Sequence, residues 1–528
     1  INWVVSILLG STFAALVAAL VGVGALRVRG LLLAVVTFSF GIAAQQYIFR
    51  RPFFSGGRTS SVPFERSRFL GLDLAEQRTY YWFCLAVLAS VVIVVARVRR
   101  SGVGRRIIAV RDNPDAAAAY TIRAAPTKLL AFAVAGALAG LAGGLMAGAI
   151  QNVPLSARLY TVDDSLQLVS MAVIGGLGSI AGAVLGALWV VGLPSFFPDN
   201  DAMPMLTSSM GLLILLLYFP GGLVQIGYSA RDALVRWLDA RVPPETTERS
   251  VTVPGSVRRV DARPAPPEGT PALLVDDVRV HFGGIAAVDG VSIEVAQGEV
   301  IGLIGTNGAG KSTLLNAIGG FVPASGRVVL GDRNITGLDA ARRAGAGLGR
   351  TFQAARLFPE LTVRETVAVA LEARGRSRFA STALGLPAAH RRERQRAAET
   401  DDIVSFLGLG RYADSYIADL STGTRRIVEL AGLLAVGADV LCLDEPTAGV
   451  AQREAEAFGP LLLEIRRELG AAMIVIEHDM PLIMSISDRM YCLELGHVIA
   501  EGRPEQVRDD PRVIASYLGT EHVDVVST

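Results

Sequence analysis

Long apolar segments occupy most of the first 224 residues of the chain. Six of them approach or exceed the roughly 20 residues that a helix needs to cross a bilayer. A single segment of this kind could be a buried core helix, but six in succession predict a polytopic membrane domain built of α-helices. The six segments are Trp3–Leu26, Gly30–Phe49, Tyr80–Ala96, Leu129–Ile150, Leu166–Leu193 and Met205–Val224.

The segment Leu166–Leu193 is interrupted near its middle by Gly175, Gly176 and Gly178. Upstream, Arg97–Arg111 holds six arginines and no acid, which indicates a cytoplasmic loop. If the polar half of the chain is cytoplasmic as well, the chain must cross the membrane an even number of times between this loop and the polar half. The count is even only when the glycine-broken segment is a hairpin or two short spans, rather than one simple crossing. Helices broken at membrane depth line cavities rather than lipid.

The pattern of the chain changes after residue 238. Residues 239–271 are rich in proline and charge, which predicts a semi-extended linker. From Ala272, short β-rich runs alternate with helical stretches, as in an α/β domain with a largely parallel sheet. We therefore expect a membrane domain at 1–238, a linker at 239–271, an α/β domain at 272–520 and a tail at 521–528. The chain opens with Ile1, and we expect the N-terminal part of the membrane domain to precede it.

Charge supports this division of the chain. The first 240 residues carry 19 Lys/Arg against 11 Asp/Glu, a net charge of +8, and the remainder carries 31 against 38, a net charge of −7. A basic, apolar front half followed by a mildly acidic back half is typical of a membrane domain joined to a soluble one. The three cysteines, Cys84, Cys442 and Cys492, lie far apart in apolar runs and imply neither a disulfide framework nor a metal site.

The stretch GTNGAGKST has the spacing of a phosphate-binding loop, with Gly305 followed after four residues by Gly310, Lys311 and Ser312. An apolar run precedes it and a helical pattern follows, which is the context that such a loop requires. Backbone N–H groups and the positive end of the helix would cradle nucleotide phosphates. We expect Lys311 to meet the β- and γ-phosphates and Ser312 to hold Mg²⁺.

A second predicted strand, VLCLDEP, ends in two acids, Asp444 and Glu445. Beside a phosphate loop, Asp444 is expected to reach Mg²⁺ directly or through water, and Glu445 to polarise the attacking water. An ordinary acidic turn after a strand is the alternative, and the phosphate loop favours the catalytic interpretation.

The region from Ala272 to about Gly519 resembles the ATPase domain of ABC transporters, because RTFQ, LSTGTRR and VIEHD follow the phosphate loop in that family's order. The fold that the resemblance implies is an α/β P-loop NTPase. It also implies that Gln353 senses Mg²⁺ and contacts the membrane domain, and that His478 touches the γ-phosphate. A lone histidine after a strand would otherwise be structural.

The resemblance implies two further contacts with nucleotide. An aromatic ring at Phe282 would stack on adenine, and Ser421 and Gly423 would bind the γ-phosphate held by the opposite ATPase subunit. The candidate ATP-binding residues are Phe282, Val288, Gly305, Thr306, Asn307, Gly308, Ala309, Gly310, Lys311, Ser312, Thr313, Ser421 and Gly423. The candidate catalytic residues are Glu445, His478 and Gln353, and the candidate Mg²⁺ ligands are Ser312, Gln353 and Asp444.

The chain departs from the family pattern at three positions. Thr422 and Thr424 replace a glycine and a glutamine of the usual signature, and Ala451 stands where an aspartate is common. Threonine restricts the close backbone approach that glycine allows. We therefore expect the ATP that this signature completes in the opposite subunit to be hydrolysed less well, while the phosphate-loop site of this chain is intact.

The first half resembles the permease subunit of branched-chain amino acid importers. The resemblance rests on LRVRGLLLAVVTFSFG, GRRIIAVRDNPDAAAAYTI, KLLAFAVAGALAGLAGGLMA and MAVIGGLGSIAGAVLGA. The ATPase half is similar to one of that system's two ATP-binding subunits. Small residues at every third or fourth position of AGALAGLAGGLMAGA also predict close helix packing.

The charged, alanine-rich segment Gly104–Ile122 lies between two predicted spans and has helical spacing. We expect it to dock in a groove on the ATPase near Gln353, with Arg105, Arg106 and Arg111 meeting acids and with Asp112 and Asp115 meeting arginines such as Arg356. A passive basic loop is the alternative.

The resemblance implies ATP-driven import of a small polar solute, with branched-chain amino acids as the expected cargo, across the cytoplasmic membrane. Urea or short amides are the alternative cargo. An exporter is disfavoured because the loop Arg97–Ala125 is short, and a membrane-tethered regulatory ATPase would need only one or two spans. The implied partners are a second permease half and a second ATP-binding subunit, from the same or a related chain, an extracytoplasmic solute-binding protein, the solute and membrane lipid. We expect no nucleic-acid partner.

Overall fold

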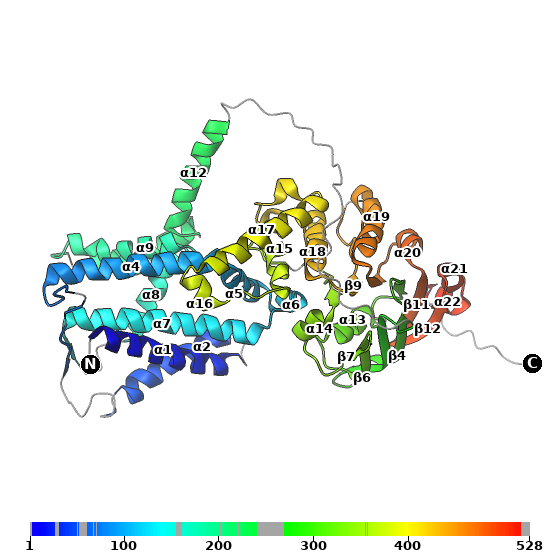
Figure 1. The fold of residues 1–528 in the computed structure, drawn as a ribbon, viewed down its shortest axis with the longest axis horizontal. Coiled ribbons are helices and arrows are strands. Elements are labelled where there is room, and N and C mark those ends of the chain that lie inside the picture. Colours follow the sequence, from blue (N-terminus) through cyan, green and yellow to red (C-terminus); the bar gives the residue numbers. More distant parts are fainter. Residues whose placement is uncertain are drawn as a thin grey trace, which may run out of the picture. The chain divides into compact units, whose positions relative to one another are not determined.

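The structure is a computed structural model, and it describes residues 3–26, 31–49, 51, 61–66, 68–69, 71–154, 161–200, 202–219, 221–239, 269–353, 355, 357–450 and 452–518. Most of the predicted linker 239–271, the whole predicted tail 521–528, Arg356 and Ala451 lie outside these residues. The chain divides into two compact units (Figure 1). The first contains Ile1–Ala96 and Lys128–Ser250, and the second contains Arg97–Thr127 and Val251–Thr528.

The first unit is built of apolar helices. Among the described residues, three stretches are long and apolar enough to cross a membrane, namely Trp3–Gly24, Gln77–Arg99 and Ala124–Ile150. They belong to α1 (Trp3–Ala25), α4 (Gln77–Arg99) and α7 (Ala124–Ile150). The other elements are α2 (Leu31–Ala43), η1 (Ala44–Ile48), β1 (Ser61–Pro63), β2 (Asn152–Pro154), α8 (Val162–Gly175), α9 (Ile180–Ala187), η2 (Leu188–Gly192), η3 (Pro194–Phe196), α10 (Met203–Met205), η4 (Leu206–Met210), α11 (Gly211–Tyr218) and α12 (Leu223–Asp239).

Small residues allow α1 and α7 to pack closely, as the spacing in α7 predicts. A Cβ atom on Gly140 would lie 2.7 Å from the Cα of Ser11, so only glycine fits at this crossing. The two helices lie side by side in Figure 1.

The predicted break in Leu166–Leu193 is confirmed. α8 ends at Gly175 and α9 begins at Ile180, so the segment is two short helices. They cross in near contact: a Cβ atom on Gly175 would lie 1.8 Å from the carbonyl oxygen of Gly182, and one on Gly186 would lie 1.9 Å from that of Met171. Any larger side chain at these two glycines would push the helices apart.

The second unit contains two sheets and the helices around them (Figure 1). The six-stranded sheet has the order β12-β11-β5-β10-β9-β8, and its strands run parallel except for β12. Its strands are β5 (Val300–Ile304), β8 (Leu348–Arg350), β9 (Val440–Asp444), β10 (Ala472–Ile476), β11 (Arg489–Glu494) and β12 (His497–Gly502). Every residue of β5, β9 and β10 is buried, as expected for parallel strands covered on both faces.

The four-stranded antiparallel sheet has the order β4-β3-β6-β7, formed by β3 (Leu273–Phe282), β4 (Ile285–Val295), β6 (Ser325–Leu330) and β7 (Arg333–Asn334). The helices of this unit are α5 (Gly102–Asp112), α6 (Pro114–Ala119), α13 (Lys311–Gly319), α14 (Ala340–Ala346), α15 (Val363–Ala370), η5 (Leu371–Ala373), α16 (Phe379–Ala383), α17 (Pro387–Phe406), η6 (Gly410–Tyr412), η7 (Ile417–Asp419), α18 (Thr422–Val436), α19 (Gln452–Leu469), α20 (Met480–Ile486), α21 (Pro504–Arg508) and α22 (Pro511–Leu518). The α/β fold with a largely parallel sheet is thus confirmed.

Candidate nucleotide site and its helical contact surface

The phosphate loop connects the buried strand β5 to α13, as its flanking pattern predicts. Gly308 and Gly310 have φ angles of 86° and 101°, which side chains other than glycine rarely adopt. Lys311 begins α13, and its Nζ donates hydrogen bonds to the carbonyl oxygens of Gly305 at 2.6 Å and Thr306 at 3.0 Å. The loop therefore curls around the ammonium, and burial lowers the pKa of Lys311 although the carboxylates of Glu445 and Asp444 oppose the shift.

The other predicted loop residues differ in exposure. Asn307 and Gly308 are exposed at the crest of the loop, whereas the side chain of Ala309 is buried in the core. Ser312 and Thr313 lie in the first turn of α13, where backbone N–H groups have no partner inside the helix. These amides and the helix dipole favour an anion at this position.

Ser312 and Asp444 meet at the carboxyl end of β9. The hydroxyl of Ser312 donates to Oδ1 of Asp444 at 3.1 Å, and Oδ2 of Asp444 lies 3.4 Å from Nη2 of Arg350. The side chains of Arg350 and Asp444 are each only 3% exposed. Burial raises the pKa of Asp444, although Arg350 opposes the shift. Sequence reasoning missed Arg350, which the RTFQ stretch contains.

The oxygens of Ser312 and Asp444 are hard donors of the kind that Mg²⁺ prefers. Within the described residues, no three His, Cys, Asp or Glu side chains gather as a metal site of their own. An ion held here would therefore complete its coordination with phosphate oxygens and water, as Mg²⁺ does in nucleotide sites.

The structure brings together the three candidate catalytic residues, which lie far apart in sequence. The side-chain amide of Gln353 donates to both carboxylate oxygens of Glu445 at 3.2 Å, and Nε2 of His478 lies 3.1 Å from Oε1 of the same carboxylate. Glu445 has a φ angle of 48°, a strained conformation for a residue with a side chain. Its backbone N–H donates to the carbonyl oxygen of Ile476, which fixes the main chain of Glu445 at the end of the sheet.

The signature residues begin α18. Ser421 is the N-cap, and its hydroxyl accepts a hydrogen bond from the backbone N–H of Thr424 at 3.3 Å and lies 2.9 Å from the hydroxyl of Thr424. Gly423 is buried in the first turn. Thr424 therefore engages the hydroxyl of Ser421 through both its backbone and its side chain.

The two residues expected near adenine differ in accessibility. Phe282 ends β3 and is 53% exposed, so its ring is available for stacking. The side chain of Val288 is 0% exposed and packs in the core, so only its backbone could face a nucleotide.

A buried ion pair that sequence reasoning missed joins α18 to the backbone around Gln353. Arg426 donates to the carbonyl oxygens of Phe352, at 2.6 Å, and Gln353. Glu429 accepts a hydrogen bond from the backbone N–H of Phe352 at 3.0 Å and lies 3.2 Å from Arg426. Burial raises the pKa of Glu429 to about 7, although Arg426 opposes the shift. These bonds thus fix α18, which carries the signature residues, to the backbone of the loop that contains Gln353.

The segment predicted as Gly104–Ile122 forms two helices, α5 and α6, which bend at Asn113 and pack on the helical part of the second unit. Tyr120 is 2% exposed and lies edge-on to the ring of Phe358, with ring centroids 5.9 Å apart. A Cβ atom on Gly432 of α18 would lie 2.2 Å from the Tyr120 hydroxyl oxygen, so glycine leaves the space that this ring fills.

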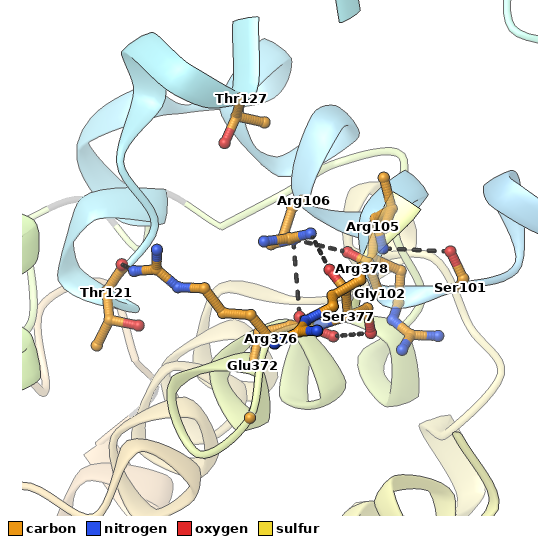
Figure 2. A network of polar contacts seen from close by, with 12 residues as sticks. Ser101, Gly102, Arg105, Arg106, Thr121, Thr127, Glu372, Arg376, Ser377 and Arg378 are labelled. Carbon is orange, nitrogen blue, oxygen red and sulfur yellow. Dashed lines mark hydrogen bonds and ion pairs between the residues drawn. The ribbon is translucent and has the colours of Figure 1, made fainter. Parts of the chain in front are cut away.

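Each of the three predicted arginines has an acidic neighbour. Arg105 pairs with Glu393 at 2.7 Å, Arg106 lies 3.7 Å from Glu372, and Arg111 pairs with Glu360 at 2.5 Å. Figure 2 shows Arg106, Glu372 and Ser377 converging, and the guanidinium of Arg106 donates to the carbonyl oxygen of Ser377 at 2.7 Å.

The start of α5 is held as well. The backbone N–H of Gly102 donates to Glu393 at 3.1 Å, and a Cβ atom on Gly102 would lie 1.6 Å from Oε1 of Glu372. Asp112 pairs with Arg111 at 2.8 Å and accepts a hydrogen bond from the backbone N–H of Glu360 at 3.2 Å. Its predicted contact with an arginine such as Arg356 stays a prediction, because Arg356 lies outside the described residues. Asp115 is exposed.

These features on one α/β domain define the ATPase class found in ABC transporters. A family model described as ABC transporter matches residues 288–448, and a second, described as branched-chain amino acid transport system / permease component, matches residues 1–218. A third, described as branched-chain amino acid ATP-binding cassette transporter, matches residues 497–523.

Curated relatives match the second half of the chain. The high-affinity branched-chain amino acid transport ATP-binding protein LivG of Salmonella typhimurium is 37% identical over 250 residues, which are 47% of this chain and 98% of LivG. BraF of Pseudomonas aeruginosa, with the same description, is also 37% identical over 47% of this chain and 98% of its own length. A solved nucleotide-free ATP-binding cassette from an ABC transporter is 32% identical over 47% of this chain and 100% of that chain, with a TM-score of 0.42.

The chain belongs to the branched-chain amino acid family of ABC transporters, and it joins a permease component and an ATP-binding component in one polypeptide. It binds ATP and couples ATP hydrolysis to transport. The permease half is a multi-pass protein of the inner membrane, and the ATPase half is cytoplasmic in this family. A transporter of this family works with partner subunits and a substrate-binding protein.

Proposed function

We propose that this chain is one half of an importer that moves branched-chain amino acids into the cell by alternating access. The observation that carries the proposal is the fusion of a permease-component match at residues 1–218 to an ATPase half whose relatives are described as branched-chain amino acid transport proteins. The break between α8 and α9 supports it, because broken helices at membrane depth supply binding groups for small polar solutes.

Within the ATPase site, we assign Mg²⁺ to Ser312 and Asp444, with Gln353 as a further ligand when nucleotide is present. Bound Mg²⁺ would neutralise charge on the transferred phosphoryl group. Arg350 compensates the buried carboxylate of Asp444 and holds it next to Ser312. Lys311 and the loop amides hold the phosphates in place.

Glu445 is the residue that we expect to orient and polarise the attacking water. Gln353 and His478 both contact its carboxylate, so they hold it in one orientation at the edge of the site. Because the strained backbone of Glu445 is fixed by the sheet, little reorganisation is needed when ATP binds. The expected contact of His478 with the γ-phosphate would add to this arrangement.

The working unit needs two permease halves and two ATPase halves, because Ser421 and Gly423 act on the ATP of the opposite subunit. The second half is a second copy of this chain or a related chain. Thr422 and Thr424 are expected to weaken hydrolysis at the site that this signature completes. The number of subunits in the purified transporter tests the first statement. The rate of ATP hydrolysis in Thr422→Gly, which we expect to exceed that of wild type, tests the second.

The cargo is tested by transport into proteoliposomes that contain the assembled transporter and its solute-binding protein. We expect ATP-dependent uptake of radiolabelled leucine, isoleucine or valine, and binding of the same solute to the binding protein. Uptake of urea or acetamide with none of leucine would assign the chain to the alternative cargo. ATP-driven accumulation of solute inside inside-out vesicles would contradict import altogether, because the lumen of such a vesicle is the extracytoplasmic side.

The contact between α5 and the ATPase half predicts a loss of coupling when its charges are reversed. In Arg105→Glu, repulsion from Glu393 should lower solute-stimulated ATP hydrolysis by about tenfold or more and leave basal hydrolysis within about twofold. The measurement is phosphate release with and without the loaded binding protein.

Two variants make this result specific to the pair. Glu393→Arg in the Arg105→Glu background should restore part of the stimulation, since the charges are then exchanged. Arg100→Glu reverses an exposed charge in the same segment and should leave stimulation unchanged. If Arg105→Glu keeps full stimulation, the contact of α5 with the ATPase half is passive and coupling runs elsewhere.

A further inference from the structure

The C-terminal segment of the ATPase half contacts the phosphate loop from outside the motif. Tyr517 lies on α22, and its phenol oxygen accepts a hydrogen bond from the backbone N–H of Gly305 at 2.9 Å, across 212 positions of sequence. Tyr517 belongs to the stretch matched by the third family model, 497–523, which lies beyond the region 288–448 that carries the general ATPase match. The C-terminal segment, which lies outside the general ATPase match, thus contacts the phosphate loop.

Gly305 is held on both sides of its α-carbon. Its N–H is bound by Tyr517, and its carbonyl oxygen accepts the hydrogen bond from Lys311 at 2.6 Å. The other end of the loop is also fastened, because the carbonyl oxygen of Ala309 accepts a hydrogen bond at 3.0 Å from the N–H of Gly496, in the turn between β11 and β12. The exposed crest of the loop lies between these two attachments.

The position of Tyr517 suits this contact. α22 packs on β12, and Val513 of the same helix is 4% exposed and joins the main core, so the helix is anchored independently of the tyrosine hydroxyl (Figure 1). Burial raises the pKa of Tyr517, although the bond from Gly305 opposes the shift, so the phenol stays neutral at pH 7. Gly305 is buried, and a buried backbone donor needs a partner.

Phosphate binding depends on several backbone N–H groups that point at one centre, and an ordered loop avoids the entropy cost of arranging them when ATP arrives. The N–H of Gly305 precedes the residues that form the crest, so Tyr517 fixes the base of the loop while the crest stays open to the phosphates.

We propose that Tyr517 is a positioning residue for nucleotide binding, through which the family-specific C-terminal segment holds the phosphate loop in its binding conformation. This inference rests on the proposed function of the loop as the ATP site. It assigns to the C-terminal segment an effect on affinity for ATP and none on the chemical step.

Tyr517→Phe tests the proposal, because it removes one hydroxyl oxygen and keeps the ring. In the full-length transporter, we expect the KM and Kd for ATP to rise about threefold to tenfold, as for loss of one hydrogen bond, with kcat at saturating ATP within about twofold of wild type. Hydrogen exchange without nucleotide provides a measurement independent of activity. The Gly305 amide should exchange at least about threefold faster in the variant.

Tyr491→Phe is the matched control. Its hydroxyl accepts a hydrogen bond from Arg489 at 2.9 Å, on a strand next to β5, so its removal costs a similar bond away from the loop. ATP affinity in Tyr491→Phe should equal that of wild type. Unchanged ATP affinity and unchanged hydrogen exchange at the Gly305 amide in Tyr517→Phe would overturn the proposal. An equal loss of ATP affinity in Tyr517→Phe and Tyr491→Phe would overturn it as well.

The same experiment separates this inference from the ATP site itself. If Lys311→Ala loses nucleotide while Tyr517→Phe behaves as wild type, the ATP site stands and the role of Tyr517 is wrong. If Lys311→Ala binds ATP normally, the ATP-site assignment fails, and the positioning role fails with it.

Discussion

Replacing Lys311 with alanine is expected to abolish ATP binding, with a loss of affinity of at least about 100-fold. Nζ of Lys311 lies inside the loop, where it holds the carbonyl oxygens of Gly305 and Thr306. An ammonium at this place both orders the loop and supplies charge-assisted hydrogen bonds to phosphate, each of which is about twice as strong as a neutral one. Equilibrium binding of a fluorescent ATP analogue to the full-length chain measures the effect.

The sequence offers a matched control for this result. Lys128 is the only other lysine among the 50 Lys/Arg of the chain, and it lies at the start of α7. Lys128→Ala should bind ATP as wild type does. Lys311→Arg should remain defective, because the loop encloses a compact ammonium and a planar guanidinium does not fit there. Wild-type affinity in Lys311→Ala would remove the phosphate loop from the nucleotide site.

Glu445→Gln should bind ATP normally and lose hydrolysis by a factor of about 100 to 10,000, the usual range for removing a general base. Glutamine keeps the shape of the side chain and can still meet Gln353, but it cannot polarise water. Because ATP then persists, the closed pair of ATPase halves should accumulate, and it is detected as retained nucleotide after rapid gel filtration. Phosphate release measures the loss of turnover.

Asp444→Asn distinguishes the two neighbouring acids. Asp444 contacts Ser312 and Arg350, not the catalytic carboxylate, so this variant should raise the Mg²⁺ concentration needed for half-maximal hydrolysis. Glu445→Gln should leave the Mg²⁺ dependence of ATP binding unchanged. Full turnover in Glu445→Gln, or an Mg²⁺ defect confined to that variant, would reverse the roles of the two residues.

The arrangement of the site also suggests how hydrolysis and transport are joined. α18 carries the signature at its N-terminus, grips the backbone of Gln353 through Arg426 and Glu429, and leaves space at Gly432 for Tyr120 of the segment between α4 and α7. A displacement of α18, of the backbone around Gln353 or of the segment that carries Tyr120 would therefore shift the other two, since closely packed interiors transmit strain.

The membrane half shows how much a hydrophobic pattern specifies and where it stops. Length and composition identified the apolar segments, and the glycines at 175–178 predicted a break that the structure confirms. The pattern could not distinguish long helices from short ones: α1, α4 and α7 reach spanning length, whereas Met205–Val224 contains several short elements. Apolar content measures preference for lipid or core, and continuity of the helix depends on local packing.

The nucleotide loop, the two acids after β9 and the α/β class could be predicted from the sequence because each is a local signal: a spacing, a strand end, an alternation of elements. The partners of those residues could not. Three contacts join positions about 77 to 212 residues apart: Arg350 with Asp444, Glu429 with the glutamine loop, and Tyr517 with Gly305. Nothing in a local pattern indicates which distant side chain will face which. The sequence by itself thus determined the kind of chemistry and the division between the membrane half and the ATPase half. Only the tertiary structure decided which groups balance charge, hold the phosphate loop and connect the signature helix to the permease segment. The reason is that those contacts exist only once the sheet and helices have brought distant residues together.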